Sequence, residues 1–137
     1  MAFTPQPLNF NLCRKLAVIR LEEANILYRE GQYSGAYYLS GYVIELGLKA
    51  YYCSKGVFPD KKIVESLYKH DPDTLLNACG LISEYYKDIK INTSLLKSWE
   101  IVRDWNEKSR YNQINKNDST VMLKSVEEVF QWIQTKW

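Results

Sequence analysis

The chain has 137 residues, of which 46% are apolar and 14% aromatic, and this is enough for one domain to bury a core without disulfides. Its 18 basic and 16 acidic residues give a net charge of +2 and are spread over both halves, which argues against a broad DNA-binding surface. The three cysteines follow no metal-binding or disulfide spacing, so we expect reduced core thiols, no metal and no cofactor.

The chain contains no pattern typical of secretion or of membrane insertion. Its first 20 residues lack a signal-peptide pattern. The longest apolar stretch, residues 36–53, is interrupted by Glu45 and Lys49 and is too short for a convincing membrane span. We therefore expect a soluble, cytoplasmic protein with no membrane partner.

The first expected elements are an extended arm and two long helices. Residues 1–8 contain two prolines and are typical of an extended arm, after which Asn9 or Asn11 can cap a helix that runs to about Glu30 and ends at Gly31. A second helix, over about residues 33–55, is apolar on nearly every side. Such a helix is packed against neighbours all round, so we expect it to be central.

The second half predicts shorter helices. A short helical turn is expected over 60–68, and a third helix begins with Asp71 as N-cap and Pro72 at the first position. Its apolar stripe is Leu75, Cys79, Ile82 and Tyr86. A fourth helix is expected from near Thr93 to near Arg110, and a last one from residue 118 or 119 to the end.

These elements together predict the fold class. No segment shows strand-like alternation, and the loops between the amphipathic helices are short. We predict an all-α, up-and-down bundle of four to five helices, formed by residues 9–137 as a single domain.

Several catalytic chemistries lack the residues that they need. The single histidine is His70, and the chain has no G-x-S-x-G, H-E-x-x-H, P-loop or G-x-G-x-x-G motif. His70 directly precedes the Asp-Pro cap of the third helix, where a local hydrogen-bonding role is the simplest interpretation. No residue is therefore assigned a catalytic role.

Charged residues on two helices are candidates for binding. Glu45 and Lys49 are spaced four apart in an otherwise uncharged stretch flanked by tyrosines, and they fit either a structural ion pair or a binding face. On the fourth helix an alternating ladder is typical of a solvated face; it consists of Glu100, Arg103, Glu107 and Arg110. Arg110 lies beside Tyr111, and this pair could hold a phosphate and stack on a base.

These residues resemble the HEPN domain family in its compact prokaryotic form. The resemblance covers about residues 12–137. It rests on segment 29–50 with its Glu45-x-x-x-Lys49-Ala50 element, on His70-Asp71 before Leu75 and Leu76, and on Trp105 through Ser109-Arg110-Tyr111. Membership implies a helical bundle, homodimers, and roles in nucleotide or RNA handling, often in toxin–antitoxin or defence systems beside a nucleotidyltransferase partner.

The chain departs from the ribonuclease motif of this family, which is an Arg followed after four to six residues by a His. Neither Arg103 nor Arg110 is followed by a histidine in that window. Asn115 can hydrogen-bond a phosphate but cannot exchange a proton near neutral pH. The resemblance therefore implies binding rather than cleavage.

We predict a non-catalytic HEPN-domain protein that binds a nucleotide, RNA or a partner protein, as a homodimer. The candidate ligand-binding residues are Glu45, Lys49, His70, Arg103, Arg110, Tyr111 and Asn115. One alternative is a ribonuclease toxin with an atypical site, in which His70 or a tyrosine replaces the missing group. A second is a module that only docks another protein.

Overall fold

A computed structural model describes residues 7–56 and 69–137 of the chain. In these residues the secondary structure is entirely helical. The elements are α1 (Phe10–Arg29), α2 (Tyr33–Ser54), α3 (Pro72–Ala78), α4 (Ile82–Ile89), α5 (Thr93–Val102), the 3₁₀ helix η2 (Glu107–Tyr111) and α6 (Lys116–Gln134). The expected helical bundle is confirmed, whereas the short turn expected over 60–68 lies outside the described residues.

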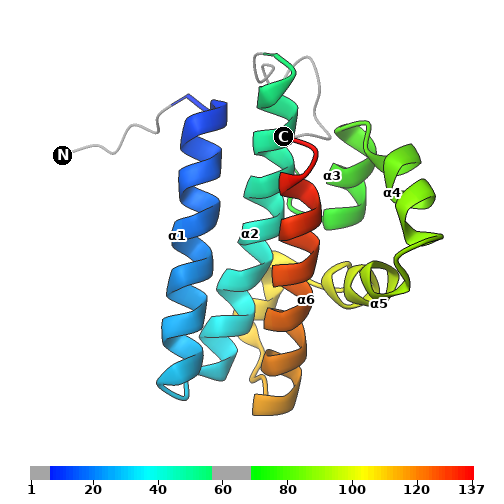
Figure 1. Cartoon of the computed structure of the whole chain (residues 1–137). Helices are drawn as coiled ribbons and strands as arrows, with labels where there is room; N and C mark the ends of the chain where they lie inside the picture. The colour runs from blue at the N-terminus through cyan, green and yellow to red at the C-terminus, as the bar shows by residue number, and fades with distance from the viewer. Residues whose placement is uncertain (1–6, 57–68) are drawn as a thin grey trace.

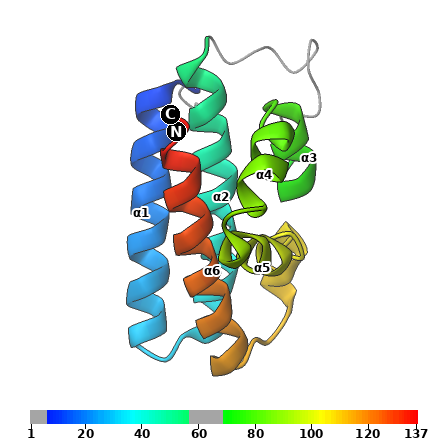
Figure 2. The ribbon, with the colours of Figure 1, turned by 45° about the vertical axis from the view of Figure 1, so that its right-hand side comes forward.

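Three long helices form the main layer of the molecule. Figures 1 and 2 show α1, α2 and α6 side by side, with α3, α4 and α5 gathered on one side of them. A tight turn through Gly31 (φ 79°) makes α1 and α2 antiparallel. The chain then passes through α3, α4 and α5 before it returns, so α6 runs in the same direction as α2.

α2 is the central helix, as its sequence predicts. Ten of its residues are buried, and α1 and α6 pack against it from different sides. Close approach is possible because small residues occupy the contact positions. A Cβ on Gly47 would lie 3.2 Å from the Phe130 ring, and the indole of Trp137 donates a hydrogen bond to the Gly47 carbonyl (3.2 Å).

The third predicted helix is wrong in its length, because the structure divides it into α3 and α4. Asp71 and Pro72 form the expected start, with the Asp71 carboxylate accepting from the Thr74 amide (3.0 Å). Gly80 then adopts φ 79°, which ends α3 and turns the chain. As a result Tyr85 is buried and Tyr86, the expected core residue, is 58% exposed.

The fourth predicted helix is also too long. α5 ends at Val102, and the 3₁₀ helix η2 follows only after Asn106, whose side chain caps it. The expected four-residue charge ladder therefore does not lie on one helix. The chain breaks here because Trp105 turns inward and is buried to 1% exposure, and burial of an indole outweighs the local charge pattern.

The last helix begins two residues earlier than expected, at Lys116. The core is rich in aromatic rings, including Trp99, Trp105 and Trp132. All three cysteines are free thiols; Cys13 and Cys79 are buried and Cys53 is partly buried. Within the described residues no helix is long and apolar enough to span a bilayer.

Candidate functional site

The charged pair on α2 is buried. Lys49 Nζ lies 3.3 Å from Glu45 Oε2, and the two side chains are 8% and 9% exposed. Their spacing of four places them on the same face of the helix, so the predicted ion pair is confirmed. Burial of two charges is costly unless further hydrogen bonds offset the loss of water. The second carboxylate oxygen of Glu45 can accept one such hydrogen bond.

His70 supplies that further contact. Its Nδ1 lies 2.5 Å from Glu45 Oε1, which joins the segment before α3 to the middle of α2. An ionised carboxylate only accepts hydrogen bonds, so Nδ1 is the donor and Nε2 is left for another partner. The imidazole is 44% exposed. His70 is therefore oriented by a long-range buried partner, where the sequence suggested a local hydrogen bond.

Two tyrosines on α2 continue this face outward. The hydroxyls of Tyr38 and Tyr42 lie 3.1 Å apart. The Tyr42 ring meets His70 edge-on at 6.3 Å and Trp105 edge-on at 4.9 Å, measured between ring centroids. Burial, followed by the Tyr38 hydroxyl, raises the pKa of Tyr42, so this phenol stays protonated and remains a hydrogen-bond donor.

Arg110 lies at the outer end of this face. Its guanidinium sits 4.7 Å above the Tyr111 ring, and Nη1 donates to the Glu107 carbonyl (3.2 Å). The phenols of Tyr111 and, more weakly, Tyr38 raise the pKa of Arg110. Tyr111 itself is 75% exposed, so one face of the ring holds the guanidinium while the rest is open to a ligand.

Contacts on both sides of η2 hold Arg110 in this place. The Trp105 indole donates to the Tyr38 carbonyl (3.1 Å) and lies against Gly41, where a Cβ would come within 2.1 Å of the ring. After η2, the Ile114 amide donates to Ser34 Oγ (2.8 Å). The segment that carries Arg110 is thus fastened to α2 before and after the 3₁₀ helix.

The structure therefore places five of the seven candidate residues around Tyr38 and Tyr42: Glu45, Lys49, His70, Arg110 and Tyr111. We use the name tyrosine–arginine surface for the outer part of this group, which consists of Tyr38, Tyr42, His70, Arg110 and Tyr111. Glu45 and Lys49 lie beneath it and orient His70 rather than reaching the surface themselves.

The other two candidates have structural contacts elsewhere. Arg103 pairs with Asp73 (2.8 Å), which also accepts from the Trp99 indole (2.8 Å), so Arg103 ties α5 to α3. Asn115 is the N-cap of α6, and its side chain accepts from the Asp118 amide (2.8 Å). The cap thus occupies the side-chain oxygen of Asn115, and the ion pair occupies one guanidinium nitrogen of Arg103.

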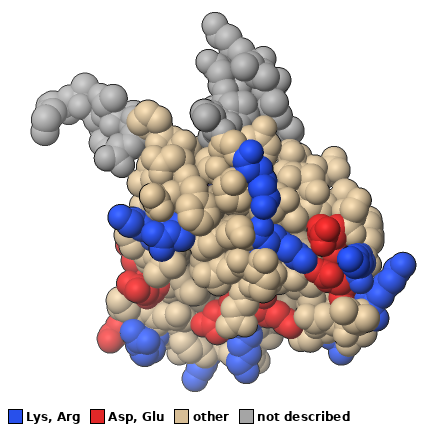
Figure 3. Space-filling model, turned by 45° about the horizontal axis from the view of Figure 1, so that its top comes forward, with Lys and Arg blue, Asp and Glu red and all other residues tan. Residues whose placement is uncertain are grey.

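Charge on the surface is mixed. Figure 3 shows one face on which basic and acidic side chains alternate, in agreement with the net charge of +2. Within the described ranges, no three histidine, cysteine, aspartate or glutamate side chains are grouped so as to hold a metal ion. The described surface therefore carries no broad basic field of the kind that attracts nucleic acid through charge alone.

Sequence reasoning named five of the residues that the structure brings together here, but it did not predict their connections. The spacing of Glu45 and Lys49 predicts that they share one face of a helix. No sequence signal pairs Glu45 with a histidine 25 positions away. The tyrosines were recognised only as flanking groups, although they join His70 to Arg110.

Fold and site together define an all-α bundle with a buried ion pair on its central helix beneath a surface that combines arginine, histidine and tyrosine. The model of the HEPN domain family matches residues 11–136, nearly the whole chain, and the chain belongs to this family. No match was found among curated proteins or among solved structures.

Proposed function

We propose that the chain binds single-stranded RNA at the tyrosine–arginine surface. The observation that carries this proposal is the placement of Arg110 over the exposed ring of Tyr111 and beside Tyr38. A guanidinium holds a phosphate through a planar pair of donors, and an exposed aromatic ring stacks on a base. Membership in the HEPN family supports the same class of ligand.

The remaining polar groups of the surface fit this ligand. Tyr42 stays protonated and can donate to a phosphate or a ribose hydroxyl, and His70 offers a second imidazole nitrogen at the same face. Unpaired bases are required, because a ring such as Tyr111 can stack only on a base that is free of its own duplex neighbours. With so few cations, binding should depend weakly on salt.

Arg110→Ala should weaken binding of a labelled, mixed-sequence single-stranded RNA by about five- to tenfold, because one charge-assisted phosphate contact is lost. Fluorescence anisotropy over a range of salt concentrations measures this loss, and the salt slope should fall by about 0.7. The matched control is Lys108→Ala, which removes the same charge from the same 3₁₀ helix and should change affinity by less than about twofold. Equal losses in the two variants would contradict a specific role for Arg110.

A second candidate function is RNA cleavage without a metal, and the 2.5 Å contact between Glu45 and His70 favours it. A carboxylate that fixes the Nδ1 proton leaves Nε2 to accept a proton, as in hydrolytic enzymes that use an oriented histidine. Nε2 of His70 would take the proton of a ribose 2′-hydroxyl as its oxygen forms a bond to the neighbouring phosphorus. The bond from phosphorus to the 5′-oxygen would then break, which leaves a 2′,3′-cyclic phosphate, and water would protonate the departing 5′-oxygen. Arg110 would stabilise the charge on that phosphate.

RNA incubated with the protein in EDTA tests this second function. Cleavage is expected to fall at least about 100-fold in His70→Ala and to be absent with a 2′-deoxy substrate, since the base and the nucleophile are then missing. Glu45→Gln should reduce the rate less, because the imidazole remains but loses its orienting charge. Uncut RNA in the presence of the unaltered protein would rule out cleavage and leave binding.

Family membership also supports a homodimer and a nucleotidyltransferase-type partner as proposals. For the dimer, the exposed face of α1 offers Val18, Ile19 and Ile26, which are 38%, 43% and 51% exposed. Apolar residues gathered on one helix face are typical of contact surfaces. Light scattering at high protein concentration that gives the monomer mass would contradict the dimer.

A further inference from the structure

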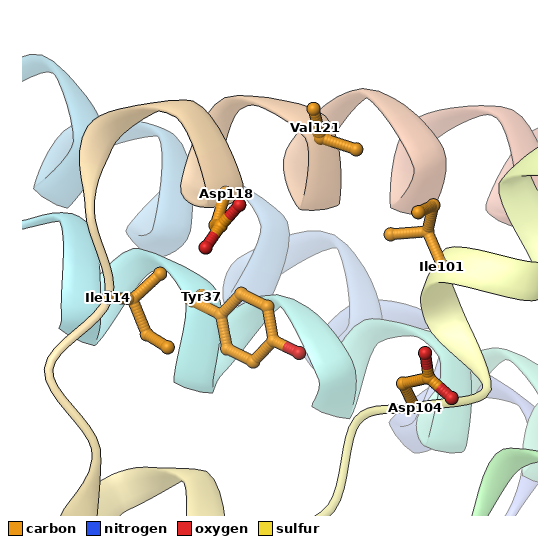
Figure 4. A pocket seen from close by; sticks show the side chains of 6 residues that line it. All are labelled: Tyr37, Ile101, Asp104, Ile114, Asp118 and Val121. Atoms are coloured by element: carbon orange, nitrogen blue, oxygen red, sulfur yellow. The ribbon is translucent and has the colours of Figure 1, made fainter.

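A hollow lies on the side of α2 that carries Tyr37. It encloses about 220 Å³ between α2, the end of α5, the loop before α6 and the first turns of α6. Figure 4 shows the Tyr37 ring in its middle, with Ile114 and Asp118 to one side and Ile101 and Asp104 to the other. Val121 completes the lining.

The walls of this hollow are held by hydrogen bonds between elements. The Ile114 amide is bonded to Ser34 Oγ (2.8 Å), and Ser119 Oγ, next to Asp118, donates to the Tyr33 carbonyl (3.0 Å). Asp104 directly precedes the buried Trp105, whose indole is bonded to α2. The hollow is therefore a fixed feature of the fold.

The lining combines an apolar floor with negative charge. Three aliphatic side chains and the Tyr37 ring form the floor, and Asp104 and Asp118 stand on opposite sides. Neither carboxylate has an ion-pair partner among the residues that the structure describes. Burial, and then the charges of Asp104 and Asp118, raise the pKa of Tyr37, which shows that both carboxylates act on the centre of the hollow.

We propose that this hollow receives a single lysine or arginine side chain from a partner protein. The aliphatic stem of such a side chain fits the floor, and its positive end fits between the two carboxylates. Phosphates of RNA or of a lipid surface are repelled by the same carboxylates. The site is thus distinct in chemistry from the tyrosine–arginine surface.

The volume of the hollow and its exposed aliphatic residues indicate that the occupant is a side chain of a polypeptide and not a free small molecule. The volume lies below the roughly 300–1,000 Å³ that is usual for small-molecule pockets. Ile101 and Val121, two of the three aliphatic side chains of the lining, are 37% and 45% exposed, and the backbone and neighbouring residues of a partner would cover them. Asp104 and Ile114 lie on either side of η2, so this partner would sit against the segment that carries Arg110.

Amide chemical-shift mapping on the full chain tests the proposal. The probe is a blocked pentapeptide, acetyl-Ala-Leu-Arg-Leu-Ala-amide, added up to about 10 mM to cover weak affinities. Its matched neutral probe carries citrulline in place of arginine, and spermidine is the third arm. We expect concentration-dependent shifts at Tyr37, Ile114, Asp118 and Val121 with the arginine peptide, and shifts at least about fivefold weaker with citrulline.

Asp104→Asn/Asp118→Asn should reduce affinity for the arginine peptide about tenfold, and Asp104→Asn alone should reduce it less. Glu22→Gln/Glu30→Gln instead removes one charge from α1 and one from the residue that follows α1, and it should leave affinity unchanged. Absence of shifts, equal binding of the citrulline peptide, or spermidine binding tighter than the peptide would each overturn the proposal. RNA affinity of the Asp104/Asp118 variant is a separate readout, so failure here is distinguishable from failure of RNA binding.

Discussion

Gly41 is the residue on which the position of Arg110 most directly depends. Glycine in the middle of a helix is unfavourable by about 1 kcal/mol relative to alanine. Here it lets the Trp105 indole lie directly on α2, since a Cβ would come within 2.1 Å of the ring. The indole in turn bonds to the Tyr38 carbonyl, and η2 with Arg110 follows two residues later. The absence of a Cβ at Gly41 therefore helps to determine the position of Arg110.

Gly41→Ala is expected to lower the free energy of unfolding by about 1–3 kcal/mol, because the overpacking of Trp105 outweighs the gain in helix propensity. RNA affinity should fall as well, since η2 must move. Urea unfolding followed by tryptophan fluorescence measures the first effect.

The matched control is Gly35→Ala on the same helix. Its Cβ would meet only the flexible Leu27 Cδ1 at 3.3 Å. Stability should stay the same or rise by up to about 1 kcal/mol. Unchanged stability in Gly41→Ala would show that the indole shifts freely.

At the scale of the element, the caps at the starts of helices give some polar side chains a structural role. Four of the α-helices that the structure describes begin with a side-chain cap, in each case an Asn or Asp that accepts from the amide three residues ahead: Asn9, Asp71, Asn92 and Asn115. Such caps satisfy amides that the helix itself leaves unpaired. Asn115 was a ligand candidate by its place after Arg110, yet its oxygen is occupied by this role.

Asn115→Ala should therefore reduce stability by about 1 kcal/mol, because α6 loses its cap. Asn115→Ser keeps a capping oxygen and should retain most of that stability. RNA affinity should be unchanged in both variants. Thermal unfolding and anisotropy on the same samples measure the two effects, and a loss of RNA affinity in the folded serine variant would restore Asn115 as a ligand.

At the scale of the whole molecule, a polar contact joins α4 to the C-terminal end of α6. Asp88 accepts from the Trp132 indole (2.8 Å) and from Lys136 Nζ (2.8 Å). Hydrogen bonds from Lys136 and then from Trp132 lower the pKa of Asp88 below its ordinary 3.8. Asp88 in turn raises the pKa of Lys136. This contact fastens the second group of helices to the main layer.

Its contribution to stability should depend on pH. Because the pKa of Asp88 is lower in the folded than in the unfolded protein, the stabilisation is present above pH 3.8 and is lost as the pH falls through the folded-state pKa. Asp88→Asn should lower the free energy of unfolding by about 1 kcal/mol at pH 7, and the two proteins should converge as the pH falls below the folded-state pKa of Asp88.

Urea unfolding at several pH values measures this convergence. Glu84→Gln is the control, because Glu84 lies farther from the same lysine (3.4 Å) and is 48% exposed. Its effect should stay below about 0.5 kcal/mol. A constant difference between the unaltered protein and Asp88→Asn at every pH would contradict the assigned role.

Much of this architecture follows from local sequence alone. Apolar periodicity, the caps at Asn9 and Asp71, and the all-round apolar character of α2 depend on residues within one or two turns of each other. The ion pair of Glu45 and Lys49 is equally local, since four residues on a helix always share a face. The class of fold was predictable for the same reason.

Other features were decided only by tertiary structure. The end of α5 was misjudged because burial of Trp105 against Gly41, 64 positions earlier, outweighs a local charge pattern that suits a longer helix. The contact of His70 with Glu45, the approach of Arg110 to the tyrosine pair, and the acidic hollow around Tyr37 all join distant segments. Such contacts depend on the path of the chain between the helices, and packing of whole elements determines that path.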